Sequence, residues 1–264
     1  TTFDLAVVGG VRVPLARALA DATHDVTLYY RSNDPSQDVW TTPSMALKAT
    51  AFRVDSGKAI TAATGLPSSK LAIFGDSTTY GISSNASGTT STTNSDATTA
   101  PGFAIGTALN ARVGLIGYGS QGYGKTGLAN APKAEDAWAS HRNGVSRLSG
   151  GLFAEMPDRI ILIWGTADCT GRVADGTNPT GTAVRNGLNT TLAAVRAAAG
   201  TKPIYVVLPP ALGYVGAPNT ELRNGVLDGF DLAAGTRALI GTSGEVSAYQ
   251  GGTDTNSYLI TLGA

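Results

Sequence analysis

The sequence predicts an α/β fold, a three-layer α/β/α arrangement with a mainly parallel sheet, from three observations. From Lys70 onward, strand-like apolar runs alternate with helical patterns, which is typical of a parallel sheet with helices on both faces. The run Arg159–Trp164 is continuously apolar after its first residue, as expected for a strand buried on both faces. Three glycine-rich turns follow predicted strands, where the ligand sites of such sheets lie: Gly75–Ser77, Gly117–Gly122 and Gly165–Asp168.

The predicted strands are Lys70–Phe74, Arg112–Ile116, Arg159–Trp164, Pro203–Leu208 and Arg237–Ile240. The clearest predicted helix is Thr182–Ala199, because apolar residues share one face and Gly200 follows at the C-terminal capping position. The residues on this face are Val184, Leu188, Leu192 and Val195. A helix is also expected at Pro101–Asn110, and a weaker one after Thr220, where two glycines lower the helix propensity.

Residues 1–65 are predicted to form a β-rich segment that precedes an α/β/α domain of residues 66–264. Val26–Arg31 and Leu47–Val54 alternate between apolar and polar residues, and the polar stretch Ser32–Ser36 separates them. This pattern indicates short strands joined by turns. Ser83–Thr99 is a low-complexity polar stretch that we expect to be a solvated loop, with a lid over the site as the alternative.

A dinucleotide-binding fold is the alternative interpretation for the start of the chain. Leu5–Gly10, Leu15–Ala22 and Asp25–Tyr30 imitate its strand–helix–strand opening. However, no third glycine follows Gly10, and Arg31 stands where an acidic residue would bind the ribose. A hairpin at the glycine pair is therefore favoured, and no cofactor is expected.

The composition excludes several functional classes. Lys+Arg and Asp+Glu number 19 each, so no basic surface for nucleic acid is expected. The chain lacks an apolar run of about eighteen residues, so no membrane span is expected. One cysteine, Cys169, excludes an internal disulfide, and with only two histidines a metal site is not expected either.

The surface of this chain must be rich in small polar residues, because only 14% of its residues are charged, against about 25% in an average domain. Such a surface is typical of secreted proteins and of subunits of virions or surface assemblies. We therefore expect protein partners or a homo-oligomer. The first residue, Thr1, fits removal of either an initiator methionine or a signal peptide.

Ser77 lies just past a buried strand, on a turn that a glycine opens, which is a position typical of an exposed nucleophile. Together with the two later glycine-rich turns, Gly75–Gly81 resembles the sequence blocks of the SGNH (GDSL-like) hydrolases in order and spacing. The resemblance covers most of the chain after Lys70. It implies a flavodoxin-like α/β/α fold and a serine that attacks the carbonyl of an ester.

The resemblance also implies roles for individual residues. Ser77 takes the position of the nucleophile, and Gly122 takes that of the glycine whose N–H binds the oxyanion. The family's oxyanion asparagine is replaced by Ala167, which has no side-chain donor. Loss of one such donor typically costs about 10²–10³ in rate.

The family's C-terminal Asp-x-x-His block can be laid on Gln250–Asn256 in two registers. One register puts Gly251 at the acid and Asp254 at the histidine, and the other puts Asp254 at the acid and Ser257 at the histidine. Neither supplies an imidazole, and a serine without a base is a poor nucleophile at neutral pH.

Two other features bear on the site. His141, between the second and third strands, is the candidate replacement base, although a surface histidine is the simpler interpretation, and a neighbouring subunit is another source of a base. Asp76, Asp168 and Trp164 are the candidate binding residues. The two acids either form a carboxylate pair near Ser77 or hydrogen-bond the backbone of their own turns.

Two functions fit these observations. The favoured one is a catalytically degenerate SGNH-like protein with a structural or glycan-binding role, whose polar cleft holds a glycan or acyl-ester ligand. The alternative is an active serine esterase or carbohydrate deacetylase that uses Ser77 with a non-standard base.

Overall fold

The fold is built on one seven-stranded sheet with the strand order β2-β1-β7-β8-β11-β10-β9. The computed structural model describes residues 20–29, 31–32, 37–43, 52–82, 94–169, 179–208 and 220–262. The strands of the sheet are β1 (Ser69–Gly75), β2 (Ala111–Gly117), β7 (Arg159–Ile163), β8 (Ile204–Leu208), β9 (Ala238–Ser243), β10 (Val246–Gln250) and β11 (Ser257–Leu262). Neighbouring pairs among β2, β1, β7, β8 and β11 are parallel, and β10 pairs antiparallel with both β11 and β9.

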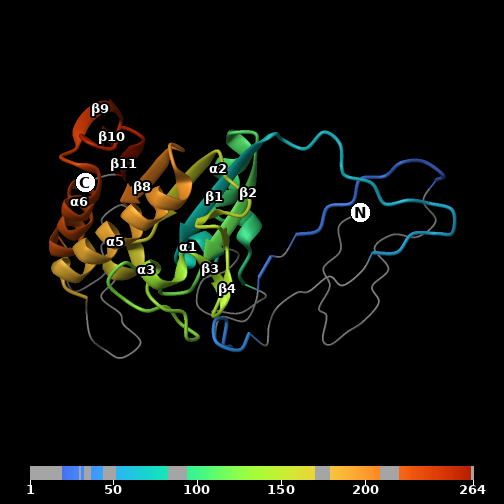
Figure 1. The fold of residues 1–264 in the computed structure, drawn as a ribbon, viewed down its shortest axis with the longest axis horizontal. Coiled ribbons are helices and arrows are strands. Elements are labelled where there is room, and N and C mark those ends of the chain that lie inside the picture. Colours follow the sequence, from blue (N-terminus) through green and yellow to red (C-terminus); the bar gives the residue numbers. More distant parts are fainter. Residues whose placement is uncertain are drawn as a thin grey trace.

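The helices of the described residues are α1 (Ser77–Tyr80), the short 3₁₀ helix η1 (Ala97–Thr99), α2 (Pro101–Ala108), α3 (Ala134–Ala137), α4 (Thr166–Cys169), α5 (Gly181–Ala199) and α6 (Thr220–Ala234). Two small hairpins lie between β2 and β7: β3 (Ser140–Arg142) with β4 (Val145–Ser146), and β5 (Leu148–Ser149) with β6 (Leu152–Phe153). Figure 1 shows α5 and α6 packed together at one side of the sheet and α2 beside β2 at the other. The predicted α/β fold class is therefore confirmed.

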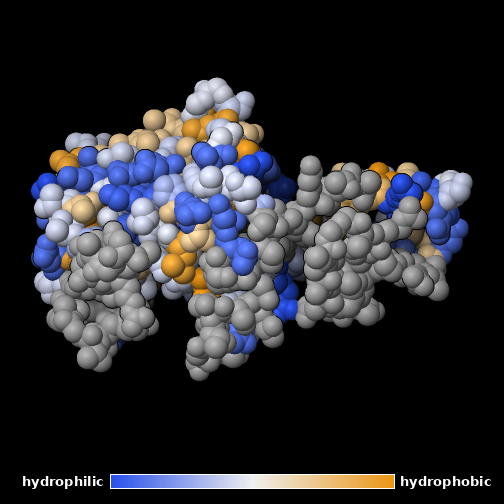
Figure 2. Space-filling model, turned by 90° about the horizontal axis from the view of Figure 1, so that it is seen from below, coloured by the Kyte–Doolittle hydropathy of each residue, from blue (hydrophilic) through white to orange (hydrophobic). Residues whose placement is uncertain are grey.

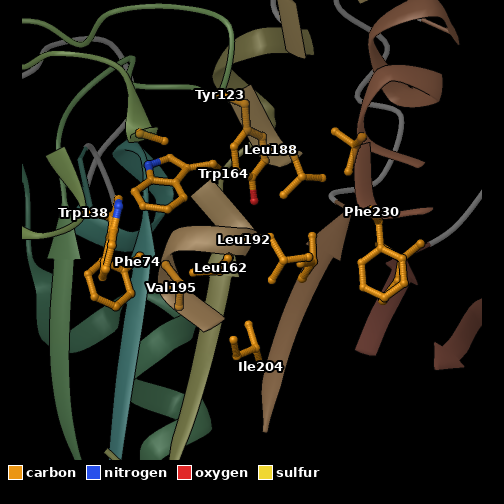
Figure 3. Close-up of a cluster of buried hydrophobic side chains, with 14 of the residues drawn as sticks. Phe74, Tyr123, Trp138, Leu162, Trp164, Leu188, Leu192, Val195, Ile204 and Phe230 are labelled. Carbon is orange, nitrogen blue, oxygen red and sulfur yellow. The ribbon is translucent and has the colours of Figure 1, made fainter. Parts of the chain in front are cut away.

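The larger part of the core lies between the sheet and α5. The four apolar residues predicted to share a face of this helix are all buried, and Figure 3 shows three of them packed beside Leu162 and Trp164. Thr180 caps the helix by accepting a hydrogen bond from the N–H of Ala183, and Gly200 ends it with a positive φ of 59°. The predicted helix is confirmed to within one residue at its start.

Helices α5 and α6 approach closely at glycines. A Cβ atom on Gly225 would lie 2.5 Å from the carbonyl oxygen of Gly181, and one on Gly229 would lie 2.7 Å from that of Arg185. The two glycines lower the intrinsic helix propensity of α6, as the sequence indicated, but they also allow its backbone to contact α5.

One predicted strand has a different place in the sheet. Arg237–Ile240 was expected to be the fifth strand of a mainly parallel sheet, and the residues from Ala238 do form a strand, β9, but it pairs antiparallel with β10 at the sheet edge. A tight turn at Gly244, with φ 57°, returns the chain as β10. The fifth parallel strand is β11, which sequence analysis did not identify.

The N-terminal residues that the structure describes contain no strand before β1. Val26–Tyr29, predicted to be a strand, lacks strand partners, and most of the predicted strand Leu47–Val54 lies outside the described residues. The opening strand and helix of the dinucleotide-binding alternative and most of Ser83–Thr99 also lie outside them. A domain boundary at residue 65 stays a prediction.

Two features are absent from the residues that the structure describes. None of their helices is long and apolar enough to cross a membrane. Within the same residues, no group of three or more histidine, cysteine or acidic side chains is placed to hold a metal ion.

Candidate functional site

Ser77 lies where three strands of the sheet end. Gly75, the last residue of β1, is paired with Gly117 of β2 on one side and with Ile163 of β7 on the other. The three glycine-rich turns that follow these strands therefore meet at one edge of the sheet, which we call the carboxyl edge. Ser77 begins α1 there, is half-buried, and its hydroxyl makes no hydrogen bond with any residue that the structure describes.

The turn that carries Ser77 is tight because glycines surround it. A Cβ atom on Gly75 would lie 2.0 Å from Oγ1 of Thr79, and one on Gly117 would lie 2.8 Å from the carbonyl oxygen of Asp76. Gly81 ends α1 in the left-handed conformation, with φ 72°. These glycines hold α1 to a single turn directly against the ends of β1 and β2.

Asp76 joins the first turn to the third. Its carboxylate is fully buried, and one oxygen accepts hydrogen bonds from the N–H and hydroxyl of Thr78, each at 2.9 Å. The other oxygen accepts from the N–H of Ala167 at 3.2 Å. Burial raises the pKa of Asp76, although these hydrogen bonds oppose the rise. The side chain caps α1 and hydrogen-bonds turn backbone, one of the two roles that the sequence allowed.

Asp168 joins the third turn to the second. Its buried carboxylate accepts hydrogen bonds from the N–H groups of Tyr123 at 2.7 Å and Gly124 at 2.9 Å. A Cβ atom on Gly122 would lie 2.4 Å from the same carboxylate, so this loop position requires glycine. Burial raises the pKa of Asp168 to about 6, with a smaller contribution from the charge of Asp76.

The predicted oxyanion donors are not free in this structure. The N–H of Gly122 donates to the carbonyl oxygen of Lys125 at 3.1 Å, within its own loop. Ala167 offers no side-chain donor, and its backbone N–H is bound by Asp76. Of the oxyanion donors that the family resemblance implies besides the N–H of Ser77, the glycine N–H is therefore engaged within its loop and the asparagine side chain is absent.

Lys125 is a site residue that sequence analysis missed. Its side chain is only 1% exposed, and its Nζ donates to the carbonyl oxygen of Ala167 at 3.2 Å. Its charge also lowers the pKa of Asp168, although burial dominates there. Lys125 thus connects the second and third turns through both its backbone and its side chain. The only sequence signal was a lysine within a glycine-rich loop, and lysines are seldom fully buried.

Trp164 belongs to the core and not to the surface of a cleft. The side chain is 1% exposed, and its Nε1 donates to Oε1 of Gln121 at 3.0 Å. Figure 3 shows the indole among buried side chains, where it packs against Tyr123 and Phe74 with ring centroids 5.7 and 5.9 Å away. Trp164 therefore supports the second turn through Gln121, and its buried indole cannot contact a ligand.

His141 lies on the exposed hairpin β3–β4, and no hydrogen bond joins it to Ser77 among the described residues. Its Nδ1 is 2.9 Å from Nη1 of Arg147. An arginine guanidinium can only donate, so Nδ1 accepts and the neutral ring carries its proton on Nε2. Burial and the charge of Arg147 also lower the pKa of His141. A general base that takes a proton on Nε2 needs the opposite tautomer.

The segment mapped onto the family's acid–histidine block lies at the opposite edge of the sheet. Ser257, the first residue of β11, is paired with Ile204, the first residue of β8, so Asp254 precedes the amino ends of the parallel strands. There its carboxylate accepts from Nε of Arg196, in the last turn of α5, at 2.6 Å. Both sequence registers are therefore wrong. The missing imidazole at residues 250–257 carries no information about the base at Ser77.

Comparisons with known proteins bear on the fold of the chain. No protein-family model and no curated protein sequence matches the chain significantly. Solved structures do: a carbohydrate esterase family 2 enzyme with a carbohydrate-binding domain from Corynascus thermopiles (Myceliophthora fergusii) has a TM-score of 0.52 at 14% identity, covering 66% of this chain and 55% of the other. A family two carbohydrate esterase from Clostridium thermocellum in complex with cellohexaose has a TM-score of 0.52 at 20% identity, covering 65% and 51%.

A third structure is that of a carbohydrate esterase whose active site displays divergent catalytic and non-catalytic binding functions. It has a TM-score of 0.53 at 14% identity, covering 74% of this chain and 59% of the other. The chain thus spans about half the length of the structures it matches. The carbohydrate esterases are SGNH-type hydrolases, and at these identities the likeness shows that this chain has their fold.

Proposed function

We propose that this protein is a glycan-binding member of the SGNH-like fold, catalytically degenerate, with its ligand at the carboxyl edge beside Ser77. The observation that carries the proposal is that no residue in the described part of the chain hydrogen-bonds the Ser77 hydroxyl as a general base would. His141 is engaged by Arg147 through Nδ1, and His24 lies on the exposed N-terminal part, where its Nε2 is 2.9 Å from the carbonyl oxygen of Ala20.

The two acids near Ser77 do not replace the base. Asp76 and Asp168 are fully buried, and each accepts hydrogen bonds from backbone N–H groups of the turns. A carboxylate used in this way fixes the shape of the site. The bound N–H of Gly122 supports the same interpretation, because an oxyanion would have to displace the carbonyl of Lys125.

The structural neighbours support a carbohydrate as the ligand class. They are carbohydrate esterases, and one was solved with cellohexaose. The active site of another displays divergent catalytic and non-catalytic binding functions. A glycan or an acylated sugar is therefore the ligand that we propose for this chain.

The proposal includes protein partners or a homo-oligomer, as in a surface assembly. Seven large apolar side chains of the N-terminal part are more than half exposed: Val26, Leu28, Tyr29, Phe52, Val54, Ile60 and Leu66. Figure 2 shows apolar surface on the part of the molecule that projects from the sheet domain. Exposed apolar surface of this extent favours contact with another protein.

An active serine esterase is the second candidate. The observation that favours it is Ser77 itself, which begins α1 at the carboxyl edge with a hydroxyl that no described residue binds. In that case the base comes from a neighbouring subunit or from residues outside the described part.

Hydrolysis of 4-nitrophenyl acetate by the protein and by Ser77→Ala, together with calorimetric titration of cellohexaose, xylohexaose and acetylated xylan, tests both candidates. We expect saturable binding of at least one glycan and equal, background-level hydrolysis by both proteins. Hydrolysis that disappears in Ser77→Ala would establish the esterase instead. Absence of binding to all three glycans at millimolar concentration would overturn the proposed ligand class.

A further inference from the structure

Residues 37–43, which we call the strap, lie against loops near the carboxyl edge although they are far from them in sequence. The N–H of Val39 donates to the carbonyl oxygen of Ala129 at 3.2 Å, and the N–H of Asn143 donates to that of Trp40 at 3.1 Å. The strap therefore contacts both the loop after β2 and the turn of the β3–β4 hairpin. Figure 1 shows it in blue beside β4.

Asp38 fixes the shape of the strap. Its carboxylate accepts hydrogen bonds from the N–H groups of Trp40 and Thr41, each at 2.8 Å, and of Thr42 at 3.2 Å. Three donors on one carboxylate hold the backbone of the strap in a single turn. The backbone position of Trp40 is therefore fixed by Asp38.

The indole of Trp40 packs edge-to-face against the ring of Tyr118, with centroids 5.7 Å apart and planes at 83°. Both side chains are half-buried, so part of each remains open to solvent. The hydroxyl of Tyr118 donates to the carbonyl oxygen of His141 at 2.9 Å, which braces this ring as well. The two rings form a rigid aromatic corner.

This corner adjoins the turn that carries Ser77. Tyr118 directly follows Gly117, and a Cβ atom on Gly117 would lie 2.8 Å from the carbonyl oxygen of Asp76 and 3.2 Å from the N of Tyr80. The corner therefore begins at the residue after Gly117, and the backbone of Gly117 contacts the turn that carries Ser77. Trp40 packs on the ring of the residue that follows Gly117, so a single residue, Tyr118, links the corner to this part of the site.

We propose that Trp40 and Tyr118 form a subsite for a pyranose ring next to Ser77, an inference that rests on the glycan ligand proposed above. A pyranose presents a face of C–H groups to an aromatic ring and a rim of hydroxyls to polar groups. The corner offers the rings, and the carbonyl oxygen of the exposed residue His141, which accepts from the hydroxyl of Tyr118, brings a polar group to it. Rigid aromatic side chains also bind at a low cost in conformational entropy.

The experiment uses the fluorescence of the protein during titration with the same three glycans. The chain has three tryptophans, and Trp138 and Trp164 are 5% and 1% exposed, so a ligand-dependent change reports on Trp40. We expect Trp40→Leu, which keeps an apolar contact with Tyr118, to bind about tenfold more weakly, equivalent to ~1.4 kcal/mol. We also expect that variant to lose the fluorescence change.

Phe52→Ala is the matched control, because Phe52 is an aromatic residue of the N-terminal part that is 53% exposed and lies outside the strap. It should bind like the unaltered protein, and circular dichroism of Trp40→Leu should be unchanged. Unchanged affinity in Trp40→Leu, with binding by the unaltered protein, would overturn the subsite and leave the glycan-binding function standing. If the unaltered protein bound none of the three glycans, both would fall.

Discussion

The two edges of the parallel sheet hold their acidic side chains in opposite ways. At the carboxyl edge, Asp76 and Asp168 are fully buried and accept from backbone N–H groups, and burial raises the pKa of each. At the amino edge, Asp158 is paired with Lys202 and bound by the N–H of Lys70, and these contacts lower its pKa. Hydrogen bonds from Ser257 and Arg196 likewise outweigh burial and lower the pKa of Asp254.

The acids of the carboxyl edge hold loops in place, whereas the acids of the amino edge form ion pairs that stabilise the sheet. Exposed ion pairs add little to stability but cost little to form. Buried carboxylates are costly unless they are hydrogen-bonded, so a protein retains them where they fix a shape. The carboxyl edge thus carries an electrostatic cost that positions the turns around Ser77.

The largest expected effect comes from removing Asp168. Asp168→Ala leaves the N–H groups of Tyr123 and Gly124 without acceptors in a buried loop, and each such loss costs about 1–3 kcal/mol. We expect the free energy of unfolding to fall by about 4 kcal/mol in urea denaturation. Asp158→Ala at the amino edge is the control. A loss from Asp168→Ala no larger than the control's would contradict the contrast between the edges.

The second effect is a dependence of stability on pH. Because the pKa of Asp168 is about 6 in the folded protein against an ordinary value of 3.8, the folded state binds more protons between these values. Stability therefore falls as pH rises through this window, by about 3 kcal/mol. Urea denaturation at pH 4.5 and pH 7 should show higher stability at the lower pH, and a rise in stability with pH would exclude a raised pKa. The acids of the amino edge act in the opposite direction, at lower pH.

A smaller effect is expected from Lys125→Met, which keeps the length of the buried side chain but removes its charge. Without that charge the pKa of Asp168 rises further, so the window of falling stability extends to higher pH. We expect a loss of about 2 kcal/mol at pH 7 and a smaller loss at pH 5. Lys202→Met, at an exposed pair, serves as the control. Equal losses at both pH values would show that the charge of Lys125 does not act on Asp168.

The smallest effect is expected from Asp254→Asn. This side chain is 21% exposed and paired with Arg196, so its replacement should cost about 1 kcal/mol or less. Because it lies at the amino edge, glycan affinity and any Ser77-dependent hydrolysis should be unchanged. A large loss of either would place residue 254 in the site after all and would reverse the assignment of the two edges.

The sequence predicted more of the fold than of the site. The buried face of α5 was predicted correctly because the spacing of Val184, Leu188 and Leu192 follows the helical period. β11 was missed because residues 250–257 were assigned to the family's acid–histidine block and the run after them was not examined for a strand. Its parallel partner is β8, distant in sequence.

The sequence predicted that the three glycine-rich turns lie at one edge of the sheet, because each follows a strand of a mainly parallel sheet, and Ser77 lies at that edge. The state of the Gly122 N–H was not predictable, because its acceptor is a carbonyl that only the folded loop brings near. The burial of Lys125 was not predictable either, because its side chain contacts Ala167 in the turn after β7, which is distant in sequence.

The strap has a consequence for how the chain can be divided. A shorter protein that began at residue 66 would contain every strand of the sheet, yet it would lose the backbone partners of Ala129 and Asn143 and the ring against Tyr118. Asp96 would lose Arg31, its partner in an ion pair. The unit that can be expressed and crystallised as a faithful version of the Ser77 region therefore starts before the strap, at a point that strand order does not reveal.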